Sequence, residues 1–245
     1  MKILSIASAS SGNATLIFND DTAILLDCGI PVKRIVEKTG SRKIDALLIS
    51  HEHSDHIKSA GAYGRKTKVP IYVNDMIVQD MPIFQKCTTV NITDTSSLTI
   101  GSIAVKPFST KHDARHALGF VFTDASTSFC YLTDTGSVSK TMREAIKDCN
   151  SYFIECDYDD DMIKEYPEYS EELKNRITSN FGHLSTQQTM ELVESLGIDR
   201  IKVVVIGHLS PRTNSPDKVK ERIAEKFPTH KDKFIVAPFD GEIDV

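Results

Sequence analysis

The segment HEHSDH at residues 51–56 constrains this chain more than any other feature. It places three histidines and one aspartate within six positions, although the whole chain of 245 residues has only eight histidines. Imidazole and carboxylate groups are ligands that suit zinc, manganese or iron. A solvated polar loop rarely carries four ligand-type side chains at this spacing. The segment therefore predicts a metal site, and a histidine rather than a carboxylate at position 53 favours hydrolytic over redox chemistry.

The residues on either side of the segment predict where it lies in the fold. The apolar run Asp45–Ser50 is typical of a buried strand, and the i, i+3, i+4 spacing of Ile57–Arg65 is typical of a helix that opens at Ile57. We therefore expect the HEHSDH segment to form a strand-to-helix loop, where several side chains can converge on one point.

Three more ligand-type residues follow apolar strand-like runs. His112 follows the run Ile103–Phe108, Asp134 ends a second run and His208 ends a third. His116 is an alternative to His112, whereas His230 has the pattern of an exposed loop residue. Each of these residues alone is more often a turn or surface residue, but together they extend the first cluster.

These residues predict two metal ions per chain that share one bridging carboxylate. Two ions about 3.5–4 Å apart can generate a hydroxide at neutral pH and stabilise both the attacking and the leaving oxygen. We assign His51, His53 and His112 to one ion and Asp55, His56 and His208 to the other, with Asp134 and a water as the bridge. Zinc and manganese both suit these ligands, and iron suits them less well.

Two further residues are expected to support the ligands. His183, in the segment GHLS before the helical pattern Thr186–Leu196, lies outside the ligand set and is a candidate general acid for the leaving oxygen. Asp27 ends another strand and is expected to hydrogen-bond the ligand loop. We therefore assign the catalytic roles to His183 and to Asp55, which is also a ligand.

Composition limits the class of protein. The chain is 40% hydrophobic, 26% charged and has a formal net charge of −5, which argues against binding nucleic acid by bulk charge. No apolar run is long enough to span a bilayer, so we expect no membrane partner. The five cysteines form no C-x-x-C pair, and Cys28, Cys130 and Cys156 lie in apolar runs. They predict a protein of the reducing cytoplasm.

The apolar pattern predicts one domain over residues 1–245, in which two sheets pack face to face between helical layers. Strands are expected at the following ranges: Met1–Ala7, Thr15–Asn19, Thr22–Asp27, Ala46–Ser50, Ile71–Val73, Leu98–Ile100, Ile103–Phe108, Gly119–Thr123, Ser128–Thr133, Tyr152–Glu155, Ile201–Ile206 and Phe234–Ala237. Helices are expected at the following ranges: Val32–Lys38, Ile57–Arg65, Val138–Asp148, Glu172–Ser179, Thr186–Leu196 and Asp217–Lys226.

The order of these motifs resembles that of the metallo-β-lactamase superfamily. The resemblance is carried by SASSGNAT (8–15), LLDCG, HEHSDH, HDA (112–114), YLTDTG, ECDYDDDM, YPEYSEELKNRI and the two GHLS segments. It implies an α+β four-layer αββα sandwich. Within the superfamily these motifs are similar to the YycJ-type family, which implies a 5′→3′ exodeoxyribonuclease linked to DNA repair.

Residues 182–212 also resemble the tRNA 3′-processing endonuclease, RNase Z. That likeness implies a catalytic His183 outside the metal shell and a metal-binding His208. The chain departs from the YycJ-type pattern at Ala9, at Arg115–Leu118 and at Pro211-Arg212. These departures leave the ligands intact and bear on the substrate.

Three residues are candidates for holding a substrate phosphate. Ser11 and Asn13 belong to the turn SSGN (10–13), whose hydroxyl, amide and backbone N–H groups can bind anions. Arg212 lies close in sequence to His208 and can bind a phosphate bidentately. Each is also compatible with ordinary surface chemistry.

Three functions remain open from the sequence. The first is a two-metal phosphodiesterase, expected to be a 5′→3′ exodeoxyribonuclease in which metal-bound hydroxide attacks the phosphodiester of DNA, or of RNA. The second is a hydrolase of a small cyclic phosphate, lactone or thioester, which the absence of a basic track favours. The third is a metal-binding module without catalysis, and the complete ligand set argues against it.

Overall fold

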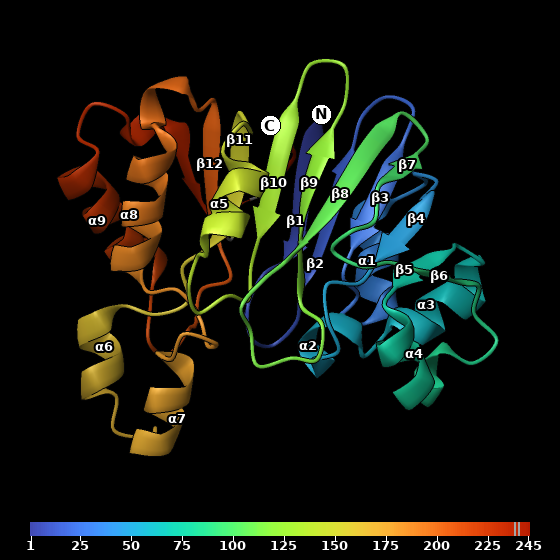
Figure 1. Ribbon diagram of the computed structural model, residues 1–245, viewed down its shortest axis with the longest axis horizontal. Helices are drawn as coiled ribbons and strands as arrows, with labels where there is room; N and C mark the ends of the chain where they lie inside the picture. Colours follow the sequence, from blue (N-terminus) through green and yellow to red (C-terminus); the bar gives the residue numbers. More distant parts are fainter. Residues whose placement is uncertain (238, 240) are drawn as a thin grey trace.

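Two seven-stranded sheets pack face to face and carry helices on their outer faces in the computed structural model, which describes residues 1–237, 239 and 241–245 (Figure 1). The first sheet has the strand order β14-β1-β2-β3-β4-β5-β6. Its strands are β1 Lys2–Ala7, β2 Ala14–Phe18, β3 Ala23–Leu26, β4 Ala46–Leu48, β5 Ile71–Val73, β6 Thr89–Asn91 and β14 Ile243–Asp244.

The second sheet has the order β13-β12-β11-β10-β9-β8-β7. Its strands are β7 Leu98–Ile100, β8 Ile103–Ser109, β9 Leu118–Thr123, β10 Ser128–Leu132, β11 Ser151–Glu155, β12 Val203–Gly207 and β13 Phe234–Val236. In each sheet the strands that come first in the chain pair antiparallel and the later ones pair parallel. The parallel strands are β3 to β6 in the first sheet and β10 to β13 in the second. The carboxyl ends of the parallel strands meet at one edge of the sandwich.

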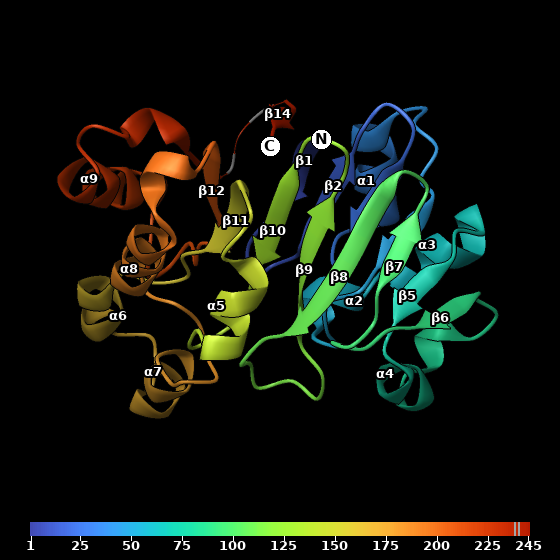
Figure 2. The same cartoon turned by 45° about the horizontal axis from the view of Figure 1, so that its top comes forward.

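The helices form the two outer layers and one separate group. Their bounds are α1 Val32–Thr39, α2 Ser54–Ile57, α3 Ala60–Thr67, α4 Asp75–Asp80, α5 Lys140–Ile146, α6 Asp160–Glu165, α7 Glu171–Ile177, α8 Thr186–Leu196 and α9 Pro216–Lys226. Figure 2 shows α5, α8 and α9 on the second sheet and α1 and α3 on the first. In Figure 1, α6 and α7 lie below α8, at the end of the second sheet.

Three apolar clusters hold these layers together. The central cluster fills the space between the sheets and includes Ile17, Leu26, Phe120 and Phe129, none of them accessible to solvent. A second cluster joins α1 and α3 to the first sheet, and a third joins α5, α8 and α9 to the second sheet. This arrangement confirms the predicted four-layer sandwich. Among the described residues, no helix has both the length and the apolar character needed to cross a bilayer.

Most elements lie where the sequence predicts them. Helix α8 matches to the residue, because Ser185 and Gln188 form a capping box at its start and Gly197, with φ 82°, ends it. All five cysteines are free, and Cys28 and Cys130 are fully buried. The pattern missed β6, β14, α4 and α6, which are short elements at edges or outside the layers.

The prediction that a helix opens at Ile57 is wrong. Ile57 instead ends α2, a single turn that already contains Asp55 and His56, and a second helix starts at Ala60. The reason is tertiary: Asn13 N donates to the Asp55 carbonyl at 2.8 Å, and Cys28 N donates to the His56 carbonyl at 2.7 Å. These backbone contacts fix α2 against two loops of the first sheet, which no local pattern encodes.

Gly29 allows this close approach. A Cβ at this position would lie 1.4 Å from the Asp55 carbonyl oxygen and 2.9 Å from Asn13 N. Gly29 N also donates to the Asn13 carbonyl at 2.8 Å, so the loop cannot move away without losing a hydrogen bond. The packing of three backbone segments around Gly29 therefore sets the position of α2.

We expect Gly29→Ala to lower the free energy of unfolding by about 2–3 kcal/mol, because the added methyl group overlaps backbone that has no room to retreat. Urea denaturation of the metal-free protein measures this change. Gly40→Ala is the matched control: its φ is 60°, but an added Cβ meets no atom within 4 Å. Its cost should be about 1 kcal/mol of backbone strain. An equal or smaller cost for Gly29→Ala would mean that α2 is not held in this way.

Candidate metal centre

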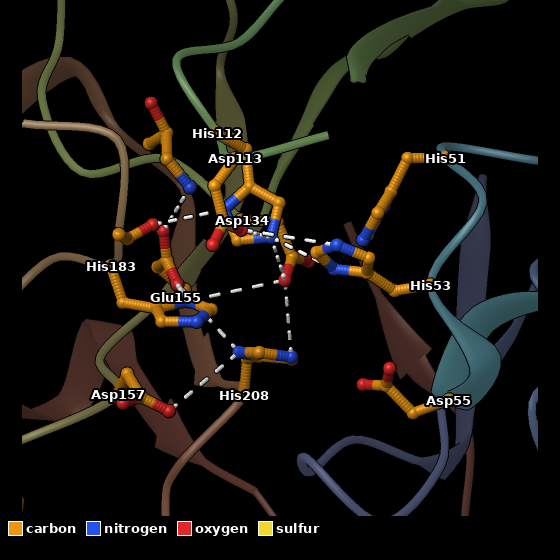
Figure 3. A network of polar contacts seen from close by, with 12 residues as sticks. His51, His53, Asp55, His112, Asp113, Asp134, Glu155, Asp157, His183 and His208 are labelled. Atoms are coloured by element: carbon orange, nitrogen blue, oxygen red, sulfur yellow. Dashed lines mark hydrogen bonds and ion pairs between the residues drawn. The ribbon is translucent and has the colours of Figure 1, made fainter. Parts of the chain in front are cut away.

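The site lies at the edge where the parallel strands of both sheets end. His51 follows β4, Asp134 follows β10, Glu155 ends β11 and His208 follows β12. His112 lies in the loop between β8 and β9. Figure 3 shows the side chains from both halves of the chain pointing toward Asp134. The sequence-predicted ligands are therefore all brought to one place.

The donor atoms form overlapping groups that suit metal binding. The ligand atoms of each group lie within 4.8 Å of one another. The groups are His51, His53 and His112; His51, His56 and Asp134; Asp55, His56 and His208; His112, Asp134 and His183; and Glu155, His183 and His208. Two of these groups, His51-His53-His112 and Asp55-His56-His208, are the ligand sets that the sequence predicts. Asp134 forms further groups with members of both sets. His116, the alternative to His112, belongs to none of the groups found among the described residues.

Several of these donor atoms lack a hydrogen-bond partner. His51 Nε2, both ring nitrogens of His208 and Asp134 Oδ2 are buried and unpartnered within the described part of the chain. Leaving a buried polar atom without a partner costs about 1–3 kcal/mol, and native proteins rarely do so without a reason. His208 Nδ1 faces Glu155 at 3.6 Å, whereas His208 Nε2 lies 3.5 Å from Asp134, which shares a ligand group with His51. The residues present therefore fit a divalent cation.

Asp134 carries the charge that the histidines face. Its carboxylate oxygens lie 3.5 Å from both His56 Nε2 and His208 Nε2 and 3.7 Å from His112 Nε2. Burial alone would raise the pKa of Asp134, but the charges of His208 and His56 outweigh it and hold that pKa well below its usual value. Burial also lowers the pKa of His51, which keeps its imidazole in the neutral form that binds metals.

Three of the strand-end residues have left-handed backbone. The φ angles are 60° for Asp27, 57° for Asp134 and 52° for His208. Residues other than glycine adopt this region at a cost, although Asp, Asn and His do so more often than most. The sharp turn directs each side chain toward the site as soon as its strand ends.

Asp27 holds His56 and the start of the ligand segment. Its carboxylate lies 2.7 Å from His56 Nδ1 and accepts hydrogen bonds from Ser50 N at 2.8 Å and Ser50 Oγ at 2.9 Å. With Nδ1 bound to Asp27, His56 Nε2 faces Asp134 and Asp55. His112 is oriented in the same manner, because its Nδ1 donates to the Gly182 carbonyl at 3.0 Å and its Nε2 faces the cluster.

His183 is paired with a buried carboxylate. Its Nδ1 lies 2.9 Å from Glu155 Oε2, and Glu155 Oε1 accepts from Thr135 N at 2.6 Å. Burial by itself lowers the pKa of His183, but the hydrogen bond and the charge of Glu155 outweigh it and raise that pKa to about 10. His183 lines the cavity over the cluster. Because its Nδ1 contacts Glu155, Nε2 is the ring nitrogen that stays free for another contact. His230, by contrast, pairs with Asp199 at 2.9 Å, outside the site.

A cavity of about 170 Å³ opens over the cluster. Its lining residues are Ser10, His53, Asp55, His112, Asp113, Asp134, Leu173, Arg176, Ile177, Gly182, His183 and His208. Arg212 is not in this lining, and Ser11 instead lines a groove on the other side of its turn. Asn13 is 1% exposed, and its Nδ2 lies 3.1 Å from Asp55 Oδ2 and 3.0 Å from His56 Nε2. Substrate contacts by Ser11, Asn13 and Arg212 stay a prediction.

Three charged residues of the site are not predicted from the sequence. Glu155 ends an apolar strand as Asp134 does, so the same strand-end pattern could have found it. Asp113 directly follows His112, and its Oδ1 lies 3.4 Å from His112 Nε2. Arg176, on α7, donates through Nε to Asp113 Oδ2 at 2.5 Å. No local signal pairs these two, because they lie 63 positions apart.

The chain has relatives of known class over most of its length. Residues 22–208 match the model of the β-lactamase superfamily domain. The chain is 34% identical over 221 residues to the exodeoxyribonuclease WalJ of Streptococcus pneumoniae, covering 85% of this chain and 81% of that protein. It is 28% identical over 232 residues to the exodeoxyribonuclease YycJ of Bacillus anthracis, covering 90% and 86%.

A solved structure has the same fold. The metallo-β-lactamase fold protein YhfI from Bacillus subtilis superimposes with a TM-score of 0.78 at 19% identity, covering 99% of both chains. The family model, these relatives and the convergence of ligand-type side chains from both sheets lead to the same assignment. The chain belongs to the metallo-β-lactamase superfamily.

Proposed function

We propose that this protein is a metal-dependent nuclease that removes nucleotides from DNA in the 5′→3′ direction. The observation that carries the proposal is the pair of ligand groups, His51-His53-His112 and Asp55-His56-His208, which both have members close to Asp134 and members that line one small cavity. Two-metal sites of this composition are typical of phosphodiester hydrolysis. The names of the relatives WalJ and YycJ, both exodeoxyribonucleases, supply the substrate class.

We propose that two divalent ions, zinc or manganese, would be held by these groups together with Asp134. Neutral imidazoles and carboxylates suit both metals. When bound, such ions supply Lewis acidity that polarises the phosphoryl group and acidifies water. The chain itself holds the ligands in place through Asp27 on His56 and the Gly182 carbonyl on His112. Contacts of this kind fix the tautomer that leaves Nε2 facing the metal.

His183 is proposed to act as the general acid. Glu155 holds its Nδ1 at 2.9 Å, which fixes the ring and leaves Nε2 to donate a proton to the leaving oxygen in the cavity. Glu155 is fully buried and also accepts from Thr135 N, so the ring orientation is fixed from behind. The role of Glu155 is therefore to position His183.

The size of the cavity favours a second candidate function. A volume of about 170 Å³ is small for a binding pocket, whose usual range begins at about 300 Å³. A small phosphodiester, lactone or thioester would fit such a site without further contacts. Activity on bis(p-nitrophenyl) phosphate together with no activity on any oligonucleotide would support this second function.

The nuclease proposal is tested with oligonucleotides of single- and double-stranded DNA and of RNA, each labelled at its 5′ end, after reconstitution with zinc or manganese. We expect the label to be released from DNA as a short product from the first time points, because the chain is removed from that end. His53→Ala should lose this activity because it removes a ligand from the cluster. Loss of the label only after internal cutting, or cleavage of RNA alone, would refute the proposed reaction.

We expect His183→Gln to lower kcat by about 10²–10⁴-fold, the usual contribution of a general acid. Metal content, measured by atomic emission, should stay at the wild-type level because His183 lies outside the two proposed ligand sets. His230→Gln is the matched control, since His230 also pairs with a carboxylate but lies outside the cavity. Wild-type turnover of the His183→Gln variant would rule out the acid role.

Asp27→Asn should weaken metal binding by about 10–100-fold, the usual effect of removing a carboxylate behind a histidine ligand. Asparagine tolerates the φ of 60° at this position, so the backbone should not change. Chelator competition measures the dissociation constant. Asp45→Asn is the control, because Asp45 accepts from Ala23 N on the same sheet and does not line the cavity. Equal metal affinities in both variants would contradict the role of Asp27.

A further inference from the structure

The α7 arm, residues 171–182, forms one wall of the cavity and lies outside the two helical layers (Figure 1). Leu173, Arg176 and Ile177 line the cavity from α7, although no residue of this helix is buried. A helix that buries none of its residues contributes little to the core. Its side chains are therefore available to a bound molecule.

The end of the arm is firmly attached to the site. His183 N donates to the Ile177 carbonyl at 2.9 Å. An added Cβ on Gly182 would lie 2.0 Å from the same carbonyl oxygen, and one on Gly136 would lie 2.2 Å from the Ser179 carbonyl oxygen. Because these backbone segments pack without spare room, the arm holds a fixed position relative to His183 and to Asp134, two residues before Gly136.

Arg176 has hydrogen-bonding capacity to spare. Its Nε donates to Asp113, but neither of its terminal nitrogens makes a hydrogen bond in the part of the chain that the structure describes. Its side chain is 62% exposed and lines the cavity. A guanidinium group carries five N–H donors in a planar fork that matches a phosphate. Asp113 orients this fork and leaves its outer donors free.

Phe181 supplies an exposed ring at the end of the arm. It is 55% exposed and, with Val36 and Met76, one of the three large apolar side chains exposed among the described residues. Its backbone directly precedes Gly182 and His183, which line the cavity, although the Phe181 side chain is not itself part of that lining. Aromatic rings in such positions stack on nucleobases in proteins that bind single strands.

The rest of this region carries net negative charge. Its acidic residues on α6, on α7 and in the connection between them outnumber Lys164 and Lys174; they are Asp160, Asp161, Glu165, Glu168, Glu171 and Glu172. A polyanion laid along these residues would be repelled. A nucleic acid is therefore expected to contact this region mainly at its Arg176 end, which limits the contact to a short stretch of chain.

We propose that the α7 arm holds the nucleotide next to the scissile phosphate: Arg176 binds that nucleotide's phosphate and Phe181 stacks on its base. The proposal rests on the proposed nuclease function and adds the two contacts that would hold the substrate chain beside the reaction centre.

The test compares a small and a large substrate in Arg176→Gln and Phe181→Ala. Bis(p-nitrophenyl) phosphate lacks the neighbouring nucleotide, so kcat/KM for it should stay within about twofold in Phe181→Ala. In Arg176→Gln it should fall by a smaller factor than kcat/KM for an oligonucleotide, because Arg176 also lines the cavity. For a single-stranded oligonucleotide, KM should rise about tenfold with little change in kcat, since stacking on one ring contributes about 1–3 kcal/mol. The dissociation constant of a fluorescent oligonucleotide from the metal-free variants, measured by anisotropy, should rise by a similar factor.

Arg143→Ala and Met76→Ala are the matched controls. Arg143 is a surface arginine on α5 with one hydrogen bond, to Ser195, and Met76 is 54% exposed on α4. Neither residue lines the cavity. Both variants should behave as wild type with either substrate.

The outcomes separate the two proposals. Wild-type KM and dissociation constants in both arm variants would overturn the role of the arm while leaving the nuclease function intact. An equal loss on both substrates would also overturn it, because it would show damage to the reaction centre. If the wild-type protein binds the oligonucleotide through the arm and cleaves none, only the proposed nuclease function fails. If it binds none, both proposals fail.

Discussion

The buried carboxylate of Asp134 is the group on which the site depends. It is 3% exposed and lies within 4 Å of ring nitrogens from His56, His112, His183 and His208. A buried negative charge is costly unless positive charge lies close to it. The histidines around Asp134 can supply that charge as protonated rings or can yield it to a bound cation. In either state, residues from both sheets must stay in place around the carboxylate of Asp134.

This requirement explains the unusual backbone of the strand ends. Asp27, Asp134 and His208 all adopt positive φ, and strained conformations of this kind cost about 1–3 kcal/mol each. The surrounding structure holds them: Ser8 Oγ, for example, accepts from His208 N at 2.7 Å. The packing of the sandwich thus maintains a local geometry that the isolated turns would not adopt.

Much of this arrangement can be predicted from the sequence, because apolar runs mark the strands and the ligand-type residues stand where the runs end. His208 after β12 is an example, and α8 is predicted to the residue because its signals are local. What could not be predicted depends on contacts between distant segments. The start of α2 is set by Asn13 and Cys28, and the pairing of Asp113 with Arg176 joins a loop to helix α7, which no periodicity connects.

The position of the ligand groups between the sheets has a consequence for folding. His51 follows a strand of the first sheet, whereas His112 and His208 belong to the second. An ion held by residues so far apart in sequence acts as a cross-link between the two halves of the chain. Because such an ion would bind the folded chain and not the open one, it would stabilise the fold by mass action, by an amount that grows with the logarithm of its free concentration. The supply of metal would then govern how long the protein persists as well as how fast it works.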